Sequence, residues 1–182
     1  MTGDMKKGEL IKMSGISLAL DDYNDLFSDF DPRPYNERAL SDDFLVEAKK
    51  AARDKASGAL ELKLMIPNAK RNKDDEVTIK KRLRDHFKRH HKMLRDEKND
   101  IVYRGLLFAV AGVIIMFVAA FFFFEKAAYK LVDKFLLILL EPAGWFLFWE
   151  GLSLVVFESK KKNPDVTFYE KMASCEINFI GY

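Results

Sequence analysis

The sequence predicts a mainly α membrane protein: a two-helix transmembrane hairpin, a small cytoplasmic α/β part, and a helical stalk continuous with the first span. The first observation is a pair of apolar segments, 106–124 and 135–157. They are about 19 and 23 residues long, and a helix needs roughly 20 to cross the hydrocarbon core. Second, the charged segment 73–105 leads into 106–124 without a proline. Third, alternating apolar residues at 60–66 and 175–182 predict strands.

The composition excludes several classes of function. The 182-residue chain has a formal net charge of only +2, which gives no electrostatic footprint for nucleic acid. It has no glycine-rich phosphate loop, nucleophile elbow or zinc-cysteine cluster, so we predict that it is not an enzyme. Cys175 is the only cysteine, and we expect it to be a buried or inert thiol. Residues 1–20 lack the apolar core of a signal peptide, so no cleavage is expected.

The cytoplasmic part before the stalk contains two strand patterns. Residues 1–15 are predicted to be a mobile end, and 16–72 the cytoplasmic α/β segment. Ile16–Leu20 and 60–66 have the composition of strands, and a proline ends the second. Because an isolated strand is not stable, we expect 60–66 to pair with 175–182, and Ile16–Leu20 to be a third strand.

A helix is predicted between these two strands. Ser41 can cap its free backbone N–H groups, and the two aspartates that follow suit the positive end of the helix dipole. Leu40 and Leu45 are spaced for a hydrophobic staple. We expect the helix to end at Ser57-Gly58.

The helical stalk is predicted over 73–105. Its apolar residues recur at spacings of four and seven, and lysines and arginines cover the other faces. The apolar positions are Ile79, Leu83, Phe87, Leu94 and Ile101. Such a stripe is expected to pack against another helix, of its own chain or of a neighbour, as in a short coiled coil.

The membrane topology follows from the basic residues that flank the apolar segments. Transmembrane helix 1 is predicted over 106–124, an outer loop over 125–134, transmembrane helix 2 over 135–157, and a cytoplasmic tail with a strand over 158–182. Lysines and arginines are more frequent before the first span and after the second than in the loop. The positive-inside rule then places both termini in the cytoplasm. The aromatic run Phe121–Phe124 suits the outer interface.

The second apolar segment contains ionisable residues, which are rare inside membranes and usually face protein or water. Pro142 predicts either a helix that starts there or a kink. On a helix, Glu141, Trp145, Phe148 and Leu152 share one stripe, with Gly144 beside it, and Glu150 lies on the opposite side. Glu150 is expected to contact the first span, a neighbouring subunit or the inner head groups. A carboxylate one turn from an aromatic ring suits cation binding when several subunits each contribute one.

Residues 141–146, Glu-Pro-Ala-Gly-Trp-Phe, resemble part of the pore helix of mitochondrial calcium uniporter channels. Those channels also have a helical stalk, two spans and a short loop, with this motif at the start of the second span. Where that family has a Trp-Asp pair, this chain has Leu137 and Ile138. The resemblance implies that Glu141 is the ion ligand, that Trp145 is the ring beneath it, and that the bound cation is calcium.

Other interpretations of the same side chains stay open. Glu141 can be a helix cap at the interface, and Glu150 can pair with a lysine of the tail. His86 and His90 have a spacing that can bind a metal, but their basic neighbours favour a solvated stalk or one that faces lipid head groups, so no metal or other cofactor is predicted.

Two functions from different classes therefore remain. The first is a homo-oligomeric channel, cation-conducting and lined by the second span, because two helices cannot enclose a pore. The second is a membrane-anchored scaffold without transport activity, which binds a cytoplasmic partner through residues 16–100. Its motivation is an acidic and aromatic surface expected at Tyr23–Tyr35.

Overall fold

The computed structural model describes residues 15–53, 60–124 and 131–182. Residues 1–14 of the predicted mobile end, the predicted helix end at Ser57-Gly58 and residues 125–130 of the predicted outer loop lie outside these residues. The predicted bounds of the mobile end and the outer loop are wrong at one end each, because Gly15 begins a strand and residues 131–134 are helical. The chain divides into two compact units. The sheet unit consists of residues up to Lys92 together with Asp165–Tyr182, and the hairpin unit is Met93–Pro164. Each unit is described by itself below.

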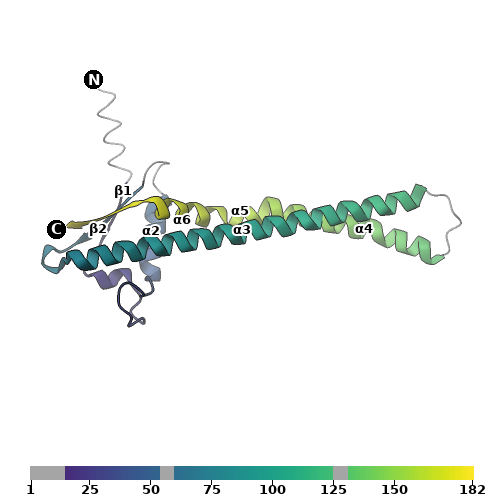
Figure 1. Cartoon of the computed structure of the whole chain (residues 1–182). Helices are drawn as coiled ribbons and strands as arrows, with labels where there is room; N and C mark the ends of the chain where they lie inside the picture. Colours follow the sequence, from purple (N-terminus) through teal and green to yellow (C-terminus); the bar gives the residue numbers. More distant parts are fainter. Residues whose placement is uncertain (1–14, 54–59, 125–130) are drawn as a thin grey trace, which may run out of the picture. The chain divides into compact units, whose positions relative to one another are not determined.

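Helices make up most of the described chain, and three short strands complete it (Figure 1). In chain order the elements are β1 (Gly15–Ala19), the 3₁₀ turn η1 (Tyr23–Leu26), α2 (Asp42–Arg53), β2 (Glu61–Ile66), the 3₁₀ turn η2 (Asn68–Lys70), α3 (Lys73–Phe124), α4 (Leu131–Ser153), the π-helical stretch η3 (Leu154–Glu158), the short α5 (Ser159–Lys161), α6 (Asn163–Ser174) and β3 (Glu176–Gly181). The prediction that the stalk and the first apolar segment form one helix is confirmed by α3.

The sheet has the order β1-β2-β3, and both pairings are parallel. In this register Leu62 lies between Ile16 and Ile177. The predicted pairing of 60–66 with the tail and the predicted third strand are therefore confirmed. The parallel direction follows from the connections, because parallel neighbours need a long crossover. The first crossover contains α2, and the second contains every element from η2 to α6.

One face of the sheet carries the core of the sheet unit. Alternate residues of β2 are fully buried, which is the period-2 pattern of a strand with one covered face. Their neighbours in the same core cluster come from β1, α2, α3, α6 and β3. The largest fully buried members are Leu62, Leu64, Ile66, Ile79, Leu83, Phe87, Met172 and Ile177, with Ile16, Leu26 and Phe27. The first three residues of the predicted stalk stripe thus pack within their own chain.

The opposite face of the sheet is polar in two of its three cross-strand rows, and the third row consists of Ala19, Met65 and Ile180. Lys63 forms an ion pair with Glu61 at 3.2 Å, and the Asn178 amide donates a hydrogen bond to Glu61 Oε1 at 3.0 Å. Parallel sheets are usually covered on both faces. Here the row of charged and amide side chains lets the second face meet water.

The predicted start of α2 is confirmed. The Ser41 hydroxyl accepts a hydrogen bond from the Phe44 N–H at 3.5 Å, and two aspartates occupy the first turn. Leu40 is buried, and Leu45 packs against the core, as expected for the residues of a hydrophobic staple.

The prediction of an aromatic surface at Tyr23–Tyr35 is wrong for most of the rings, because they pack against the core. Tyr23 and Phe27 are buried, and Tyr35 stacks on Phe27 with ring centroids 5.1 Å apart. Asp22 causes this arrangement, because its carboxylate caps η1 by accepting from the Asn24 N–H at 3.2 Å. The capped turn directs the rings onto the core. Only Phe30 is fully exposed, at 98%.

A partly buried ion pair joins the residue after η2 to the first turn of α3. The Arg71 guanidinium donates to both carboxylate oxygens of Glu76, at 2.8 Å and 3.0 Å. The Tyr23 hydroxyl donates to the same carboxylate at 3.1 Å and accepts from the Asn72 N–H at 2.9 Å. The hydrogen bonds from Arg71 lower the pKa of Glu76 from its ordinary value. The pair therefore orients the first turn of α3 against η1.

Candidate functional site

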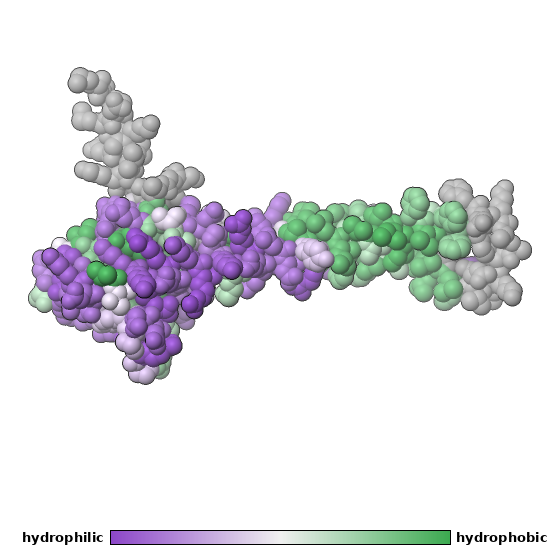
Figure 2. All heavy atoms as spheres, viewed as in Figure 1, coloured by the Kyte–Doolittle hydropathy of each residue, from purple (hydrophilic) through white to green (hydrophobic). Residues whose placement is uncertain are grey.

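The hairpin unit contains the sequence-predicted site. α3 and the α4 region are each long and apolar enough to cross a membrane, by length and composition. Figure 2 shows hydrophobic residues gathered over the apolar parts of these two helices. The predicted two-helix pattern is thus present in the fold.

Glycines bring the α3 and α4 backbones into contact. A Cβ atom on Gly112 would lie 2.5 Å from the Phe148 nitrogen and 2.6 Å from the Gly144 oxygen. A Cβ atom on Gly105 would lie 2.8 Å from the Gly151 oxygen. Non-bonded heavy atoms do not approach this closely, so these positions accept no side chain. Small residues at such crossings are typical of helices packed in a membrane.

The same glycine contacts set the depth of the two carboxylates. Gly112 lies against Gly144, and Gly105 lies against Gly151. In this antiparallel register Glu141 is level with the turn of α3 around Phe117, and Glu150 with the turn around Phe108. At 1.5 Å per residue, the level of Glu141 lies about 10 Å from Phe124, at the apolar end of α3, whereas the level of Glu150 lies only about 3 Å from Leu106, where the apolar part of α3 begins. Measured along α3, Glu141 is the more deeply placed of the two.

Pro142 lies inside α4, which runs without interruption from Leu131 to Ser153. The interpretation that a helix starts at Pro142 is therefore wrong. The interpretation of Glu141 as an N-terminal cap is also wrong, because about ten residues of helix, or roughly 15 Å, precede it.

The predicted stripe on α4 divides between two environments. Gly144 is buried against α3, whereas Phe148 and Leu152 are half-buried. Glu141 and Trp145 are exposed, and Trp145 has 59% of its surface accessible. The stripe therefore follows the edge of the helix pair and not its interface.

Trp149 extends this exposed edge and was not singled out from the sequence. Its ring stacks on that of Trp145, with centroids 6.4 Å apart and planes inclined by 20°. The four-residue spacing of the two tryptophans is the signal that could have identified it. Gly105, Gly112 and Gly151 were also missed, although seven residues separate Gly105 from Gly112 and Gly144 from Gly151.

Glu150 is half-buried, and no hydrogen bond or ion pair to it occurs among the described residues. The interpretation that it pairs with a lysine of the tail is therefore wrong for the described lysines. Lys162 instead pairs with Glu97 at 3.0 Å, and Lys161 pairs with Glu158. The Lys162–Glu97 pair joins the residue after α5 to α3, whereas the Lys161–Glu158 pair is local to one helical run.

His86 and His90 of the stalk are half-buried, although the sequence predicted that they would face solvent or lipid head groups. His86 and His90 stack with ring centroids 4.1 Å apart, and His90 stacks on Tyr169 at 5.3 Å. His86 Nε2 is buried without a hydrogen-bond partner among the described residues. Within residues 15–53, 60–124 and 131–182, no group of three or more metal-binding side chains is present. The ring stack makes this pair part of the packing between α3 and α6.

Acid should weaken the sheet unit through His86. Burial, with the charges of His90, Arg82 and Arg89, lowers the His86 pKa to about 4, from 6.5. Because the folded-state pKa is depressed, the fold favours the neutral imidazole of His86. The stability that this preference contributes is complete above pH 6.5 and is lost as the pH falls towards 4. We expect a loss of about 1–2 kcal/mol, measured by urea unfolding of the full chain in micelles. His86→Leu should reduce this dependence and leave the part due to His90, whose pKa burial also lowers. The matched His91→Leu should retain the full dependence, so equal pH profiles for the two variants would contradict the assignment.

The thiol of Cys175 is buried, as expected. Its Sγ donates to the Met172 carbonyl oxygen at 3.1 Å, and burial raises its pKa to about 11. A thiol with so high a pKa is a poor nucleophile at neutral pH.

Comparison with known proteins adds no relative to these observations. No family model matches the chain, and no match was found among curated proteins or among solved structures.

Proposed function

We propose that this chain is an integral membrane protein that assembles with copies of itself into a cation-conducting pore lined by α4, with both termini in the cytoplasm. The single observation that carries the proposal is the position of Glu141. Its side chain is exposed on the edge of the helix pair, about two turns inside the apolar end of α3. It has no hydrogen-bond or ion-pair partner among the described residues.

A carboxylate in this position is unfavourable in lipid. Placing an aspartate at the centre of a transmembrane helix costs about 3 kcal/mol on insertion scales, and a glutamate is expected to cost a similar amount. The cost falls when the group faces protein or water, and α3 does not cover it. A neighbouring copy of the hairpin is therefore the simplest cover for Glu141. Because two helices cannot enclose a pore, several copies are needed.

Such an assembly would place one carboxylate per subunit in a ring. Rings of carboxylates select cations by charge, and calcium prefers several oxygen ligands. The stacked Trp145 and Trp149 would form a rigid apolar wall on the same edge. Phe148 and Gly144 would hold α4 against α3, so that the ring keeps a fixed diameter.

Cation flux through reconstituted vesicles tests this proposal. Glu141→Gln removes the charge at nearly constant volume, and we expect calcium flux to fall by about tenfold or more. Glu158→Gln is the matched control, because Glu158 lies on the polar side of the apolar segment, paired with Lys161. Unchanged flux in Glu141→Gln, or a particle mass of one chain in micelles, would reject the pore.

A membrane-anchored scaffold is the second candidate function. The observation that favours it is Phe30, a large apolar side chain that is 98% exposed in a loop of the sheet unit. A single exposed ring can anchor a partner protein. Under this alternative the chain is a monomer or dimer without conductance, and Phe30→Ala abolishes capture of its cytoplasmic partner.

A further inference from the structure

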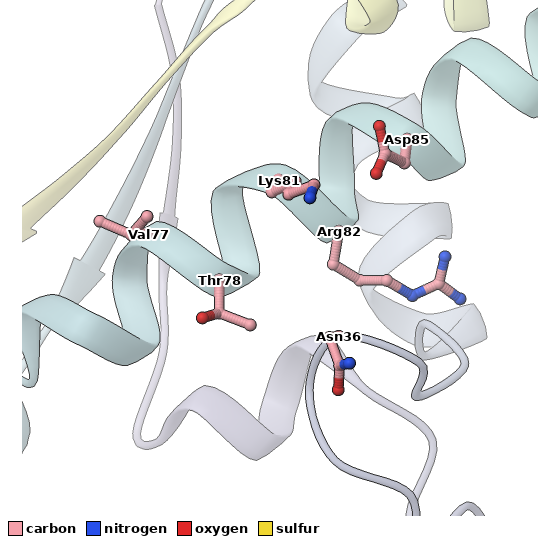
Figure 3. A pocket seen from close by; sticks show the side chains of 6 residues that line it. All are labelled: Asn36, Val77, Thr78, Lys81, Arg82 and Asp85. Atoms are coloured by element: carbon pink, nitrogen blue, oxygen red, sulfur yellow. The ribbon is translucent and has the colours of Figure 1, made fainter.

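A polar groove lies between α3 and the loop that precedes α2, within the sheet unit. A hollow of about 640 Å³ is lined by Asn36 from the loop and by Val77, Thr78, Lys81, Arg82 and Asp85 from α3. Figure 3 shows Thr78 and Arg82 on the side of α3 that faces the loop segment carrying Asn36. A second hollow of about 380 Å³ shares two of these residues and adds Arg33, Glu37 and Arg89. The two hollows adjoin at Asn36 and Arg82, and together they are called the groove below.

Hydrogen bonds from two arginine side chains to backbone carbonyl oxygens fix the shape of this groove. Arg82 Nε donates to the Arg38 carbonyl oxygen at 2.9 Å, which holds the loop against α3. The Arg38 guanidinium in turn donates to the Ser28 carbonyl oxygen at 2.9 Å and 3.1 Å. The loop is thus closed on itself and attached to the helix. A groove of this kind needs little rearrangement to receive a ligand.

The cations of the groove are only partly neutralised. Arg33 is held by Asp31, with Nη2 to Oδ2 at 2.7 Å. By contrast, Lys81 and Arg89 have no ion pair or hydrogen bond among the described residues, and Arg82 uses only Nε. Burial lowers the pKa of Arg82, and the neighbouring charges of Arg89 and Arg33 lower it further. An anion between these guanidinium groups would relieve their mutual repulsion.

The acceptors in the groove restrict the kind of anion. Asp85 and Glu37 also line it, and neither forms an ion pair with another described residue. A bare polyanion would be repelled by these carboxylates, whereas a ligand that carries hydroxyl or amino donors would satisfy them. Arginine forks match phosphate oxygens. The volume is also within the range of small-molecule sites, about 300–1,000 Å³.

We propose that this groove binds a phosphate ester that also carries hydroxyl or amino groups, with Arg82 and Arg89 on the phosphate and Asp85 and Glu37 on the donors. Both a free nucleotide and the inositol phosphate head group of a lipid have this chemistry. The proposal is independent of conduction, because every residue it uses belongs to the sheet unit.

Calorimetry on the full chain in micelles tests the groove. The probes are adenosine 5′-monophosphate and inorganic phosphate, with vesicles containing phosphatidylinositol 4-phosphate or phosphatidylglycerol as a second arm. We expect saturable binding of the nucleotide or of the inositol lipid, at least tenfold tighter than inorganic phosphate. Arg89→Gln should weaken it about tenfold, as expected for a lost charged hydrogen bond. Lys88→Gln is the matched control, because it removes one charge from α3 outside the groove.

Each outcome decides the proposal. Binding to the nucleotide alone identifies a soluble ligand, and binding to inositol lipid alone identifies a head group; both support the groove if Arg89→Gln weakens them selectively. Equal losses in Arg89→Gln and Lys88→Gln would mean attraction by the general positive charge of α3 and would overturn the proposal. The proposal is also overturned if neither the nucleotide nor the inositol lipid binds saturably, or if phosphatidylglycerol binds as well as the inositol lipid.

Discussion

Gly112→Leu should separate α3 from α4 and cost about 2–4 kcal/mol of hairpin stability. The reason is backbone contact, because a Cβ atom at this position would lie 2.5 Å from the Phe148 nitrogen. A flexible side chain could move away, but a helix backbone can only move as a whole. Overpacking of a well-filled contact usually costs 1–3 kcal/mol, and displacement of two helices adds to that. Unfolding of the reconstituted or micelle-bound chain by sodium dodecyl sulfate measures the change.

Two further variants make this prediction specific. Gly112→Ala should also destabilise the hairpin, although alanine favours a helix over glycine by about 1 kcal/mol. Ala120→Leu is the matched control, because Ala120 is exposed on the same helix and its added methyl groups meet no backbone. A stabilising Gly112→Ala, or equal losses in Gly112→Leu and Ala120→Leu, would contradict the close approach of the helices.

Arg71→Met should destabilise the sheet unit by about 2–4 kcal/mol at neutral pH. Arg71 supplies two hydrogen bonds to Glu76, whose side chain is only 9% exposed. Without Arg71 the carboxylate stays buried with Tyr23 as its remaining donor. Removal of one partner of a buried pair costs about 3–5 kcal/mol, and the partial exposure of Arg71 reduces this figure. Urea unfolding of the full chain in micelles measures it.

The pH dependence of this loss identifies its cause. The folded-state pKa of Glu76 is depressed, so the pair stabilises the fold above the ordinary glutamate pKa and loses its effect as the pH falls through the folded-state value. The cost of Arg71→Met should therefore shrink in acid. Adding Glu76→Gln should recover part of the stability, because no charge is then left unpaired. Lys50→Met, which breaks the exposed pair with Glu47, should change stability by less than about 0.5 kcal/mol; a loss equal to that of Arg71→Met would contradict the burial argument.

Much of the fold could be predicted because its signals are local and periodic. Alternation over 60–66 and 175–182 predicted β2 and β3, and an uninterrupted helical pattern from Lys73 predicted α3. Ser41 predicted the start of α2 through its capping hydroxyl. Each of these signals depends on residues that are close in the sequence, so it can be recognised without knowledge of the tertiary contacts.

Other expectations failed where distant contacts decide the outcome. The aromatic residues between Tyr23 and Tyr35 were expected on the surface, because aspartates are interleaved with them. Instead the aspartates cap a turn, and the rings pack on the core. His86 was expected in solvent, but α6 brings Tyr169 against the histidine stack. Neither contact has a signal in the local sequence, because the residues that cover these side chains are far away in the chain.

The candidate pore residues are an intermediate case. The sequence placed Glu141, Trp145 and Phe148 on one stripe, but it left open whether Pro142 begins a helix. α4 continues through Pro142, and the glycine contacts place Glu141 deeper than an interfacial cap. Trp149 joins Trp145 on the exposed edge. The conducting role of these residues stays a prediction.

The sequence by itself determined the presence of two long apolar helical segments, the order of the strands along the chain and the presence of a carboxylate in the second segment, because hydropathy and periodicity are properties of neighbouring residues. Only the tertiary structure decided which face of α4 meets α3, since that depends on four glycines in two helices matching in register. It also decided the direction of the strands, the burial of His86 and the groove beside Arg82, because each of these requires segments far apart in the chain to meet.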